Sequence, residues 1–380
     1  MNYPIYLDYN ATTPCHPDVV EKMTPWFSTH FGNAASKSHP YGWVAEDAVE
    51  IARDQLAQLI GARAKEIIFT SGATEAINLA VKGVFEYYTG QTQHFITCQT
   101  EHKAVLDTFK SISDRGAEVT YLPVNEYGDI DLEQLKDSIT DKTKMIALMW
   151  ANNETGVIHP TQEIAKIAEE RNIILFTDGV QAVGKIPISL EGVHMMAISA
   201  HKFYGPKGIG ALYIRHNHVL PKPLPLIVGG GHEKGYRSGT LNVPGIVGMG
   251  EAAAIAFKEM EIVNDKLQTL RDKLENGILK LDGVKLNGSQ KNRLPHVSNL
   301  AFEGVGGEDL LQRLNKEIAV SSGSACTSIS PKPSHVLEAM GIKGELGRSS
   351  VRFSLGRFTT EKEIDFTIDY VKKILGSLRS

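Results

Sequence analysis

The chain has 380 residues, of which 42% are hydrophobic and 22% charged, and its formal net charge is −4. This composition is typical of a soluble globular protein whose core is large enough for two domains. The slightly acidic balance and the lack of a basic stripe argue against direct binding of nucleic acid. The apolar run over residues 145–151 is too short to span a membrane.

The cysteines and the first residues of the chain predict a cytoplasmic location. Cys15, Cys98 and Cys326 are odd in number and far apart in the sequence. This spacing argues against a disulfide framework or a zinc cluster and is typical of a reducing compartment. Residues 1–8 lack the basic and then apolar segments of a secretory signal peptide.

Short apolar runs alternate with longer amphipathic runs along the first two thirds of the chain. Helical patterns cover residues 45–60, where Gly61 is a plausible C-terminal cap, and residues 76–88. Strands are predicted at residues 66–70, 94–98, 118–124, 144–150, 173–177, 195–200 and 210–214. The alternation predicts an α/β fold with a mostly parallel sheet that is covered by helices.

The pattern changes near residue 250, where a long helix is predicted over residues 251–280. The final helix opens with Thr360 as its N-cap and Glu363 three residues later, which is the spacing of a capping box. Apolar residues then repeat at helical spacing, which predicts a core face. We expect a large domain over residues 15–259 and a small domain made of residues 1–14 and 260–380.

Lys202 follows the predicted strand 195–200 and precedes a turn rich in glycine and proline. Lysine is seldom buried, and a desolvated amine loses its proton easily and can form a Schiff base with an aldehyde. The alternative is a surface lysine after a strand, which is the more common case for a lysine taken alone.

Polar residues also follow the other predicted strands. Because ligands of parallel sheets bind at the carboxyl ends of the strands, these residues are expected to share one site. The small residues from Ser71 to Thr74 precede a helix and suit a phosphate, although Ser71 or Thr74 could simply cap that helix. Asp178 would suit a protonated pyridine nitrogen, an N-cap or a metal, while His102 could be an ordinary satisfied histidine.

Taken together, these segments resemble the class V aminotransferases, which are pyridoxal-phosphate enzymes of fold type I. The resemblance is closest to the cysteine desulfurases of housekeeping iron–sulfur-cluster assembly. It rests on motifs that run almost end to end, at residues 6–14, 31–36, 71–75, 100–105, 152–156, 229–233, 237–241, 321–328 and 352–357. The implied fold is a mostly parallel seven-stranded sheet with helices on both faces, followed by a smaller C-terminal α/β domain.

The resemblance implies pyridoxal 5'-phosphate as the cofactor. Lys202 would carry it and move protons, and His102 would stack on its ring as the acid/base helper. Asp178 would pair with the ring nitrogen and Gln181 with the phenolic oxygen. The full implied set of cofactor-binding residues is Ala73, Thr74, His102, Asn153, Asp178, Gln181, Ser199, His201, Lys202 and Thr240.

The phosphate would be held by Thr74, Ser199 and His201. Thr240 would reach the same phosphate from the second subunit of a homodimer. The remaining implied partners are L-cysteine and a sulfur-acceptor protein, such as an iron–sulfur scaffold or a sulfur relay protein. Neither a membrane nor a resident metal is implied.

The substrate would be bound by Asn153 and Arg352 through its carboxylate, and its sulfur would pass to Cys326. A guanidinium suits a carboxylate, and the apolar neighbours of Arg352 argue against the alternative of a surface ion pair. Cys326 lies among serines and threonines, which predicts an exposed loop and an accessible thiolate. Cys98 lies inside a predicted strand and is assigned to the core.

The implied reaction is that of a cysteine desulfurase. L-Cysteine becomes L-alanine, its sulfur becomes a persulfide on Cys326, and thiol exchange delivers it for iron–sulfur clusters or tRNA thiolation. Cys326 would then briefly approach a cluster held by the partner. The sequence printed here ends at Ser380, short of the tail with which close relatives engage their scaffold, so the acceptor stays open.

Two other readings remain. An aminotransferase or selenocysteine lyase would share the fold, but an aminotransferase has no use for the thiol of Cys326. A non-catalytic binding protein on the same fold would be expected to lose Lys202 or Cys326, and both are present.

Overall fold

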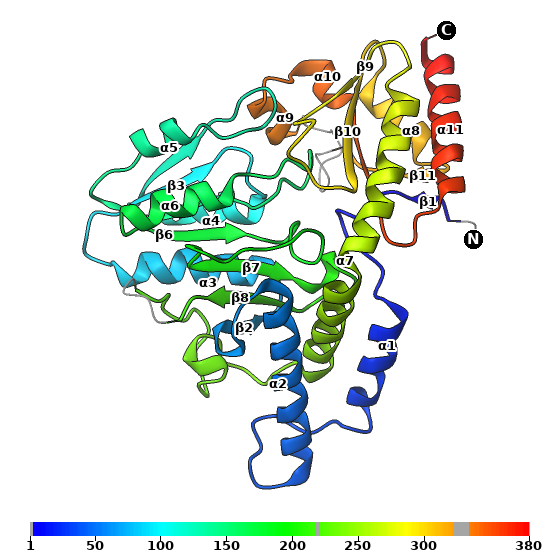
Figure 1. Ribbon diagram of the computed structural model, residues 1–380. Coiled ribbons are helices and arrows are strands. Elements are labelled where there is room, and N and C mark those ends of the chain that lie inside the picture. The colour runs from blue at the N-terminus through cyan, green and yellow to red at the C-terminus, as the bar shows by residue number, and fades with distance from the viewer. Residues whose placement is uncertain (1–2, 217–220, 323–333, 380) are drawn as a thin grey trace.

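The computed structural model describes residues 3–216, 221–322 and 334–379 (Figure 1). The predicted sulfur carrier Cys326 lies outside the described residues. Among the described helices, none combines the length and the apolar character needed to cross a membrane.

The centre of the molecule is a seven-stranded sheet with the strand order β2-β8-β7-β6-β5-β3-β4. All neighbouring strands are parallel except β8, which is antiparallel to both β2 and β7. The predicted fold class is thereby confirmed. The strands are β2 (Ile67–Thr70), β3 (His94–Cys98), β4 (Glu118–Leu122), β5 (Thr143–Ala147), β6 (Ile174–Asp178), β7 (Met195–Ser199) and β8 (Gly210–Ile214).

Helices cover both faces of this sheet because alternate strand residues point to opposite sides. On one face, residues such as Ile146 and Ile198 join a cluster with apolar residues of α2, α6 and α7. On the other face, Met145 and Ala197 pack with α3 and α4. The helices and turns of this part are α1 (Pro17–Met23), η1 (Thr24–Phe27), α2 (Pro40–Ile60), η2 (Ala64–Glu66), α3 (Ala73–Tyr87), α4 (Lys103–Ser113), α5 (Leu132–Asp137), α6 (Thr161–Glu170), η3 (Ala200–Lys202), η4 (Glu233–Gly235) and α7 (Val243–Ile278).

A second apolar core lies beyond the middle of α7, which runs from the large sheet towards the C-terminal helix (Figure 1). A three-stranded antiparallel sheet of order β12-β10-β9 lies beside it, and β1 near the N-terminus pairs in parallel with β11. The elements are β1 (Ile5–Tyr6), β9 (Val284–Leu286), β10 (Val297–Phe302), α8 (Gly307–Leu314), β11 (Ile318–Ala319), α9 (His335–Ala339), α10 (Gly344–Arg348), β12 (Ser350–Ser354) and α11 (Glu361–Arg379). The division near residue 260 stays a prediction, and α7 crosses it without a break.

The predicted start of the long helix was wrong by eight residues, because α7 begins at Val243 and not at residue 251. The glycines at its start favour a loop prediction, yet one of them is needed for packing. A Cβ on Gly250 would lie 2.5 Å from the Cα of Ala52 on α2. The bare glycine therefore lets the two helices approach closely.

The capping box of the final helix is confirmed. The backbone N–H of Thr360 donates to Oε2 of Glu363 at 2.7 Å, and the N–H of Glu363 donates to Oγ1 of Thr360 at 3.3 Å. Ile364, Val371 and Leu375 are buried in the second core, as their helical spacing predicts.

Candidate active site

Apart from Arg352 and Thr240, the predicted site residues of the described chain lie where strands of the large sheet end. Each follows a buried strand whose apolar side chains fix its position. Ala73 and Thr74 open α3 after β2, His102 caps α4 after β3, Asn153 follows β5, Asp178 ends β6, Gln181 lies in the next turn, Ser199 ends β7, and His201 and Lys202 lie in η3. Parallel strands bring these ends to one edge of the sheet.

The opening of α3 is suited to an anion. The first N–H to bond within this helical turn is that of Ala76, which donates to the carbonyl of Gly72. The N–H groups of Ala73 and Thr74 precede it and have no acceptor within the helix, and they carry the positive end of the helix dipole. Gly210 of β8 packs on this turn, and a Cβ there would lie 2.7 Å from the Cα of Gly72.

An N-terminal segment, residues 8–13, closes the site beside Lys202. The amine of Lys202 donates to the carbonyl oxygens of Asn10 and Ala11 at 2.6 and 2.7 Å. The ring Nδ1 of His201 lies 3.0 Å from Oγ1 of Thr12. Sequence reasoning used this segment as a motif but missed that it contacts the lysine, since no local pattern signals so distant a partner.

The environment of Lys202 favours the neutral amine. Burial lowers the pKa of Lys202 from its ordinary value of 10.5 to about 8, and the charge of Arg352 acts in the same direction. The carboxylates of Asp178 and Asp8 oppose this shift. Attack on an aldehyde requires the neutral amine, and the lowered pKa makes that form more abundant at neutral pH than it is for an ordinary lysine.

Asp178 is buried and the His102 side chain is exposed, and the charge of each shifts the pKa of the other. Burial raises the pKa of Asp178, against the opposing charges of His102 and Lys202, and its Oδ1 accepts from the N–H of Val180 at 2.9 Å. Desolvation lowers the pKa of His102. Its Nδ1 accepts from the N–H of Ala104 at 3.1 Å, so the neutral ring carries its proton on Nε2.

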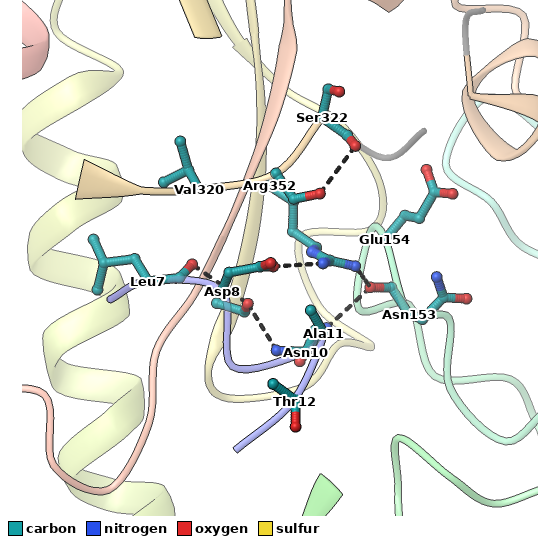
Figure 2. A network of polar contacts seen from close by, with 12 residues as sticks. Leu7, Asp8, Asn10, Ala11, Thr12, Asn153, Glu154, Val320, Ser322 and Arg352 are labelled. Carbon is teal, nitrogen blue, oxygen red and sulfur yellow. Dashed lines mark hydrogen bonds and ion pairs between the residues drawn. The ribbon is translucent and has the colours of Figure 1, made fainter. Parts of the chain in front are cut away.

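Arg352 lies in β12 and reaches the site from the second core (Figure 2). Its Nη2 contacts Oδ1 of Asp8 at 2.6 Å, and its Nη1 donates to the carbonyl of Asn153 at 2.8 Å. Arg352 is only 4% exposed, so the alternative of a surface ion pair is wrong. Among the described residues, Nε of Arg352 and Oδ1 of Asn153 are buried without a hydrogen-bond partner. Such groups suit a polar ligand.

Gln181 is held by a residue that sequence reasoning missed. Its Oε1 accepts from the amine of Lys185 at 2.7 Å, and its Nε2 donates to the carbonyl of Asn10 at 3.1 Å. Burial, followed by the charges of Lys202 and Arg352, holds the pKa of Lys185 well below its ordinary range. The i,i+4 spacing of Gln181 and Lys185 was the available signal.

Thr240 is not brought to the other site residues within this chain. It is exposed on the segment between Ile227 and Asn242. That segment is anchored by Arg237, whose Nε donates to Glu75 in the first turn of α3 at 2.8 Å. It is also anchored by buried Glu233, which pairs with Arg53 of α2 at 2.7 Å.

The described cysteines are poor nucleophiles. Cys98 is fully buried, and burial raises its pKa to about 11, which confirms its assignment to the core. Burial also raises the pKa of Cys15. Neither environment favours a thiolate at neutral pH.

The chain matches the family model described as Aminotransferase class-V over residues 5–366. It is 52% identical to "Cysteine desulfurase IscS" of Anaeromyxobacter sp. (strain K), across 97% of this chain and 91% of that relative. It is also 52% identical to the protein of that name from Pectobacterium carotovorum subsp. carotovorum (strain PC1), across 100% of this chain and 94% of the relative.

Solved structures extend the similarity to three dimensions. A structure named "NIFS-LIKE PROTEIN" superposes with a TM-score of 0.92 at 38% identity, covering 99% of this chain and 100% of that one. A second, "SspA in complex with cysteine", has a TM-score of 0.82 at 35% identity and covers 94% of this chain and 100% of its own.

Proposed function

We propose a role for each residue of the site, because this chain belongs to the class-V aminotransferase family and is a pyridoxal-phosphate-dependent cysteine desulfurase. Such an enzyme takes L-cysteine as its substrate and passes the sulfur to an acceptor. The observation that carries this conclusion is identity of about one half to curated cysteine desulfurases over nearly the whole chain.

The residues at the strand ends fit pyridoxal 5'-phosphate. Lys202 offers an amine for the aldehyde, Asp178 a buried carboxylate for the ring nitrogen, and Gln181 an amide for the phenolic oxygen. When bound, the cofactor supplies the aldehyde that captures the substrate amine and a ring that takes up electrons from the substrate. His102 caps α4 at the end of β3 with its side chain exposed, and it would stack on that ring and assist proton transfer.

The phosphate would be held at the opening of α3 by the N–H of Ala73 and by Thr74. Ser199 at the end of β7 and His201 in η3 would complete this part of the site. Burial, together with the charge of Lys202, lowers the pKa of His201 to about 4, so the imidazole is neutral at neutral pH and can donate one hydrogen bond.

The residues of this chain would carry out substrate binding, proton transfer and sulfur transfer. Arg352 and Asn153 bind the substrate carboxylate, and the neutral amine of Lys202 takes the proton from the substrate α-carbon. The thiolate of Cys326 attacks the substrate sulfur, and a sulfur–sulfur bond forms as the carbon–sulfur bond breaks. The electron pair of that bond goes to the substrate β-carbon, which is protonated, and Lys202 returns its proton to the α-carbon to give L-alanine. Cys326 is left as a persulfide for thiol exchange with the acceptor.

The carboxylate site is tested by Arg352→Lys, which keeps the charge but loses the planar pair of donors. We expect the KM for L-cysteine to rise roughly 10- to 100-fold, with a smaller change in kcat. Steady-state release of alanine measures both constants. Arg348→Lys, at an exposed pair with Glu345, is the matched control and should leave KM unchanged. An unchanged KM in Arg352→Lys would remove this role.

A homodimer is the proposed assembly, in which Thr240 of one subunit contributes to the phosphate site of the other. Two observations support it: Thr240 is exposed on an anchored segment, and apolar side chains are exposed nearby in the chain, with Val228 79% exposed. We expect a dimer in light scattering of the purified protein. A monomer with full activity would contradict the proposal.

The acceptor is proposed to be a protein that carries sulfur or assembles iron–sulfur clusters, with tRNA thiolation as a second route. The support is the similarity to proteins named IscS. A cytoplasmic location is proposed with it, because the described cysteines are free thiols, as in a reducing compartment.

A further inference from the structure

Asn10 is a buried asparagine whose side chain joins two elements of the site. It is 1% exposed. Its Nδ2 donates to the carbonyl of Asn153 at 3.0 Å, and its Oδ1 lies 2.9 Å from Nε2 of His296. Because a carbonyl can only accept, the amide orientation is fixed with Nδ2 towards Asn153. Oδ1 therefore faces the histidine.

The main chain of Asn10 joins the other half of the site. Its carbonyl oxygen accepts from the amine of Lys202 at 2.6 Å and from Nε2 of Gln181 at 3.1 Å. Its N–H donates to Oγ of Ser354 in β12 at 2.9 Å. Every polar group of Asn10 is thus engaged, and each partner belongs to a different part of the chain.

His296 fixes the orientation of the Asn10 side-chain amide. It is 2% exposed, just before β10, and burial holds its pKa well below its ordinary range, so the ring is neutral. Since Oδ1 of Asn10 is an acceptor, Nε2 of His296 must carry the proton. This donor prevents the Asn10 amide from turning over, because a flipped amide would place two N–H donors face to face.

Asn153 connects the side chain of Asn10 to the guanidinium of Arg352. The carbonyl of Asn153 accepts from Asn10 and from Nη1 of Arg352, so one oxygen links the two side chains (Figure 2). A continuous series of hydrogen bonds therefore runs from His296 through Asn10 to the guanidinium. The main-chain carbonyl of Asn10 also accepts a hydrogen bond from the amine of Lys202.

We propose that Asn10 and His296 are positioning residues that hold Arg352 and Lys202 in a fixed relation, so that a substrate bound through its carboxylate presents its α-carbon to the lysine. The inference rests on the proposed roles of Arg352 and Lys202. It adds two residues to the site, and neither of them follows a strand of the large sheet.

The test compares His296→Leu, which removes the N–H donor, with His296→Gln, which keeps one. L-Alanine is titrated into the cofactor-loaded protein, and binding is followed by the visible absorbance. We expect the Kd for L-alanine to rise about tenfold in His296→Leu and to stay within about threefold of wild type in His296→Gln. The value of kcat/KM for L-cysteine should fall in parallel.

Asn287→Ala is the matched control for a general loss of stability. Asn287 is also buried and donates from its side chain to Asn299 and Ser350, without contact to Asn10. It should lower Tm and leave the Kd for L-alanine unchanged. The inference is wrong if His296→Leu behaves like this control, or if His296→Gln binds L-alanine as weakly as His296→Leu.

Arg352→Lys, measured in the same titration, separates this inference from the proposed function. If it weakens L-alanine binding and His296→Leu does not, the positioning role alone is wrong. If Arg352→Lys leaves L-alanine binding unchanged, the carboxylate site is wrong and the inference falls with it.

Discussion

In the Cys326→Ala variant we expect the release of sulfide from L-cysteine to fall by at least about a thousandfold, because the nucleophile that accepts the sulfur is gone. The visible absorbance of the bound cofactor should be retained, since the residues that hold it lie at the strand ends. Alanine and sulfide are measured together, in the presence of a reductant.

Cys15→Ala is the control, and it should leave turnover close to wild type because burial disfavours the Cys15 thiolate. Normal turnover in Cys326→Ala would show that Cys326 is not the sulfur carrier. Alanine without sulfide from the wild type would mean that the persulfide is unloaded only by its partner. A complete lack of alanine, despite normal absorbance, would favour the aminotransferase reading.

The second large effect is expected for Lys202→Ala. Without the amine, the protein should lose covalent attachment of pyridoxal phosphate and at least about a thousandfold of its turnover. Reduction with borohydride followed by mass spectrometry measures the attachment and locates it. Lys185→Gln is the matched control, because Lys185 is the neighbouring amine whose pKa burial also lowers. That variant should still attach the cofactor, and attachment at Lys185 in the wild type would contradict the assignment.

The pH dependence of cofactor uptake follows from the same lysine. Only the neutral amine reacts, and the pKa of Lys202 is lowered to about 8. The rate of uptake by cofactor-free protein should therefore rise ~tenfold per pH unit at lower pH and level off above pH 8. The lowered pKa also means that the unfolded chain binds more protons between about 8 and 10.5, so the contribution of Lys202 to stability rises with pH across that window.

The sheet and most of the site were predictable because both depend on local patterns. A buried apolar run marks each strand, and the polar residue after it, such as Asp178 or Lys202, marks the binding edge. The contacts of Asn10 were not predictable. Its partners Lys202 and His296 are far away in the sequence, and only the folded chain places them within hydrogen-bond distance.

Helix boundaries failed for a different physical reason. Gly245, Gly248 and Gly250 lower helix propensity, which moved the predicted start of α7 forward. In the fold, close packing against neighbouring elements such as α2 outweighs that propensity. The role of Lys185 was not predicted because lysines are usually exposed. The burial of Lys185 depends on the other residues of the folded site that surround it.

The contacts of the N-terminal segment also determine when the site can form during synthesis of the chain. Its first residues leave the ribosome early, but Leu7 bonds to Ala319, Asp8 to Arg352 and Asn10 to Ser354. These partners are made much later, so the loop that must close spans most of the described chain. A nascent chain can complete its large sheet and still lack a working centre. The N-terminal segment and Arg352 can therefore meet only after residue 352 has been made, and a product that stops before that residue lacks the proposed carboxylate site.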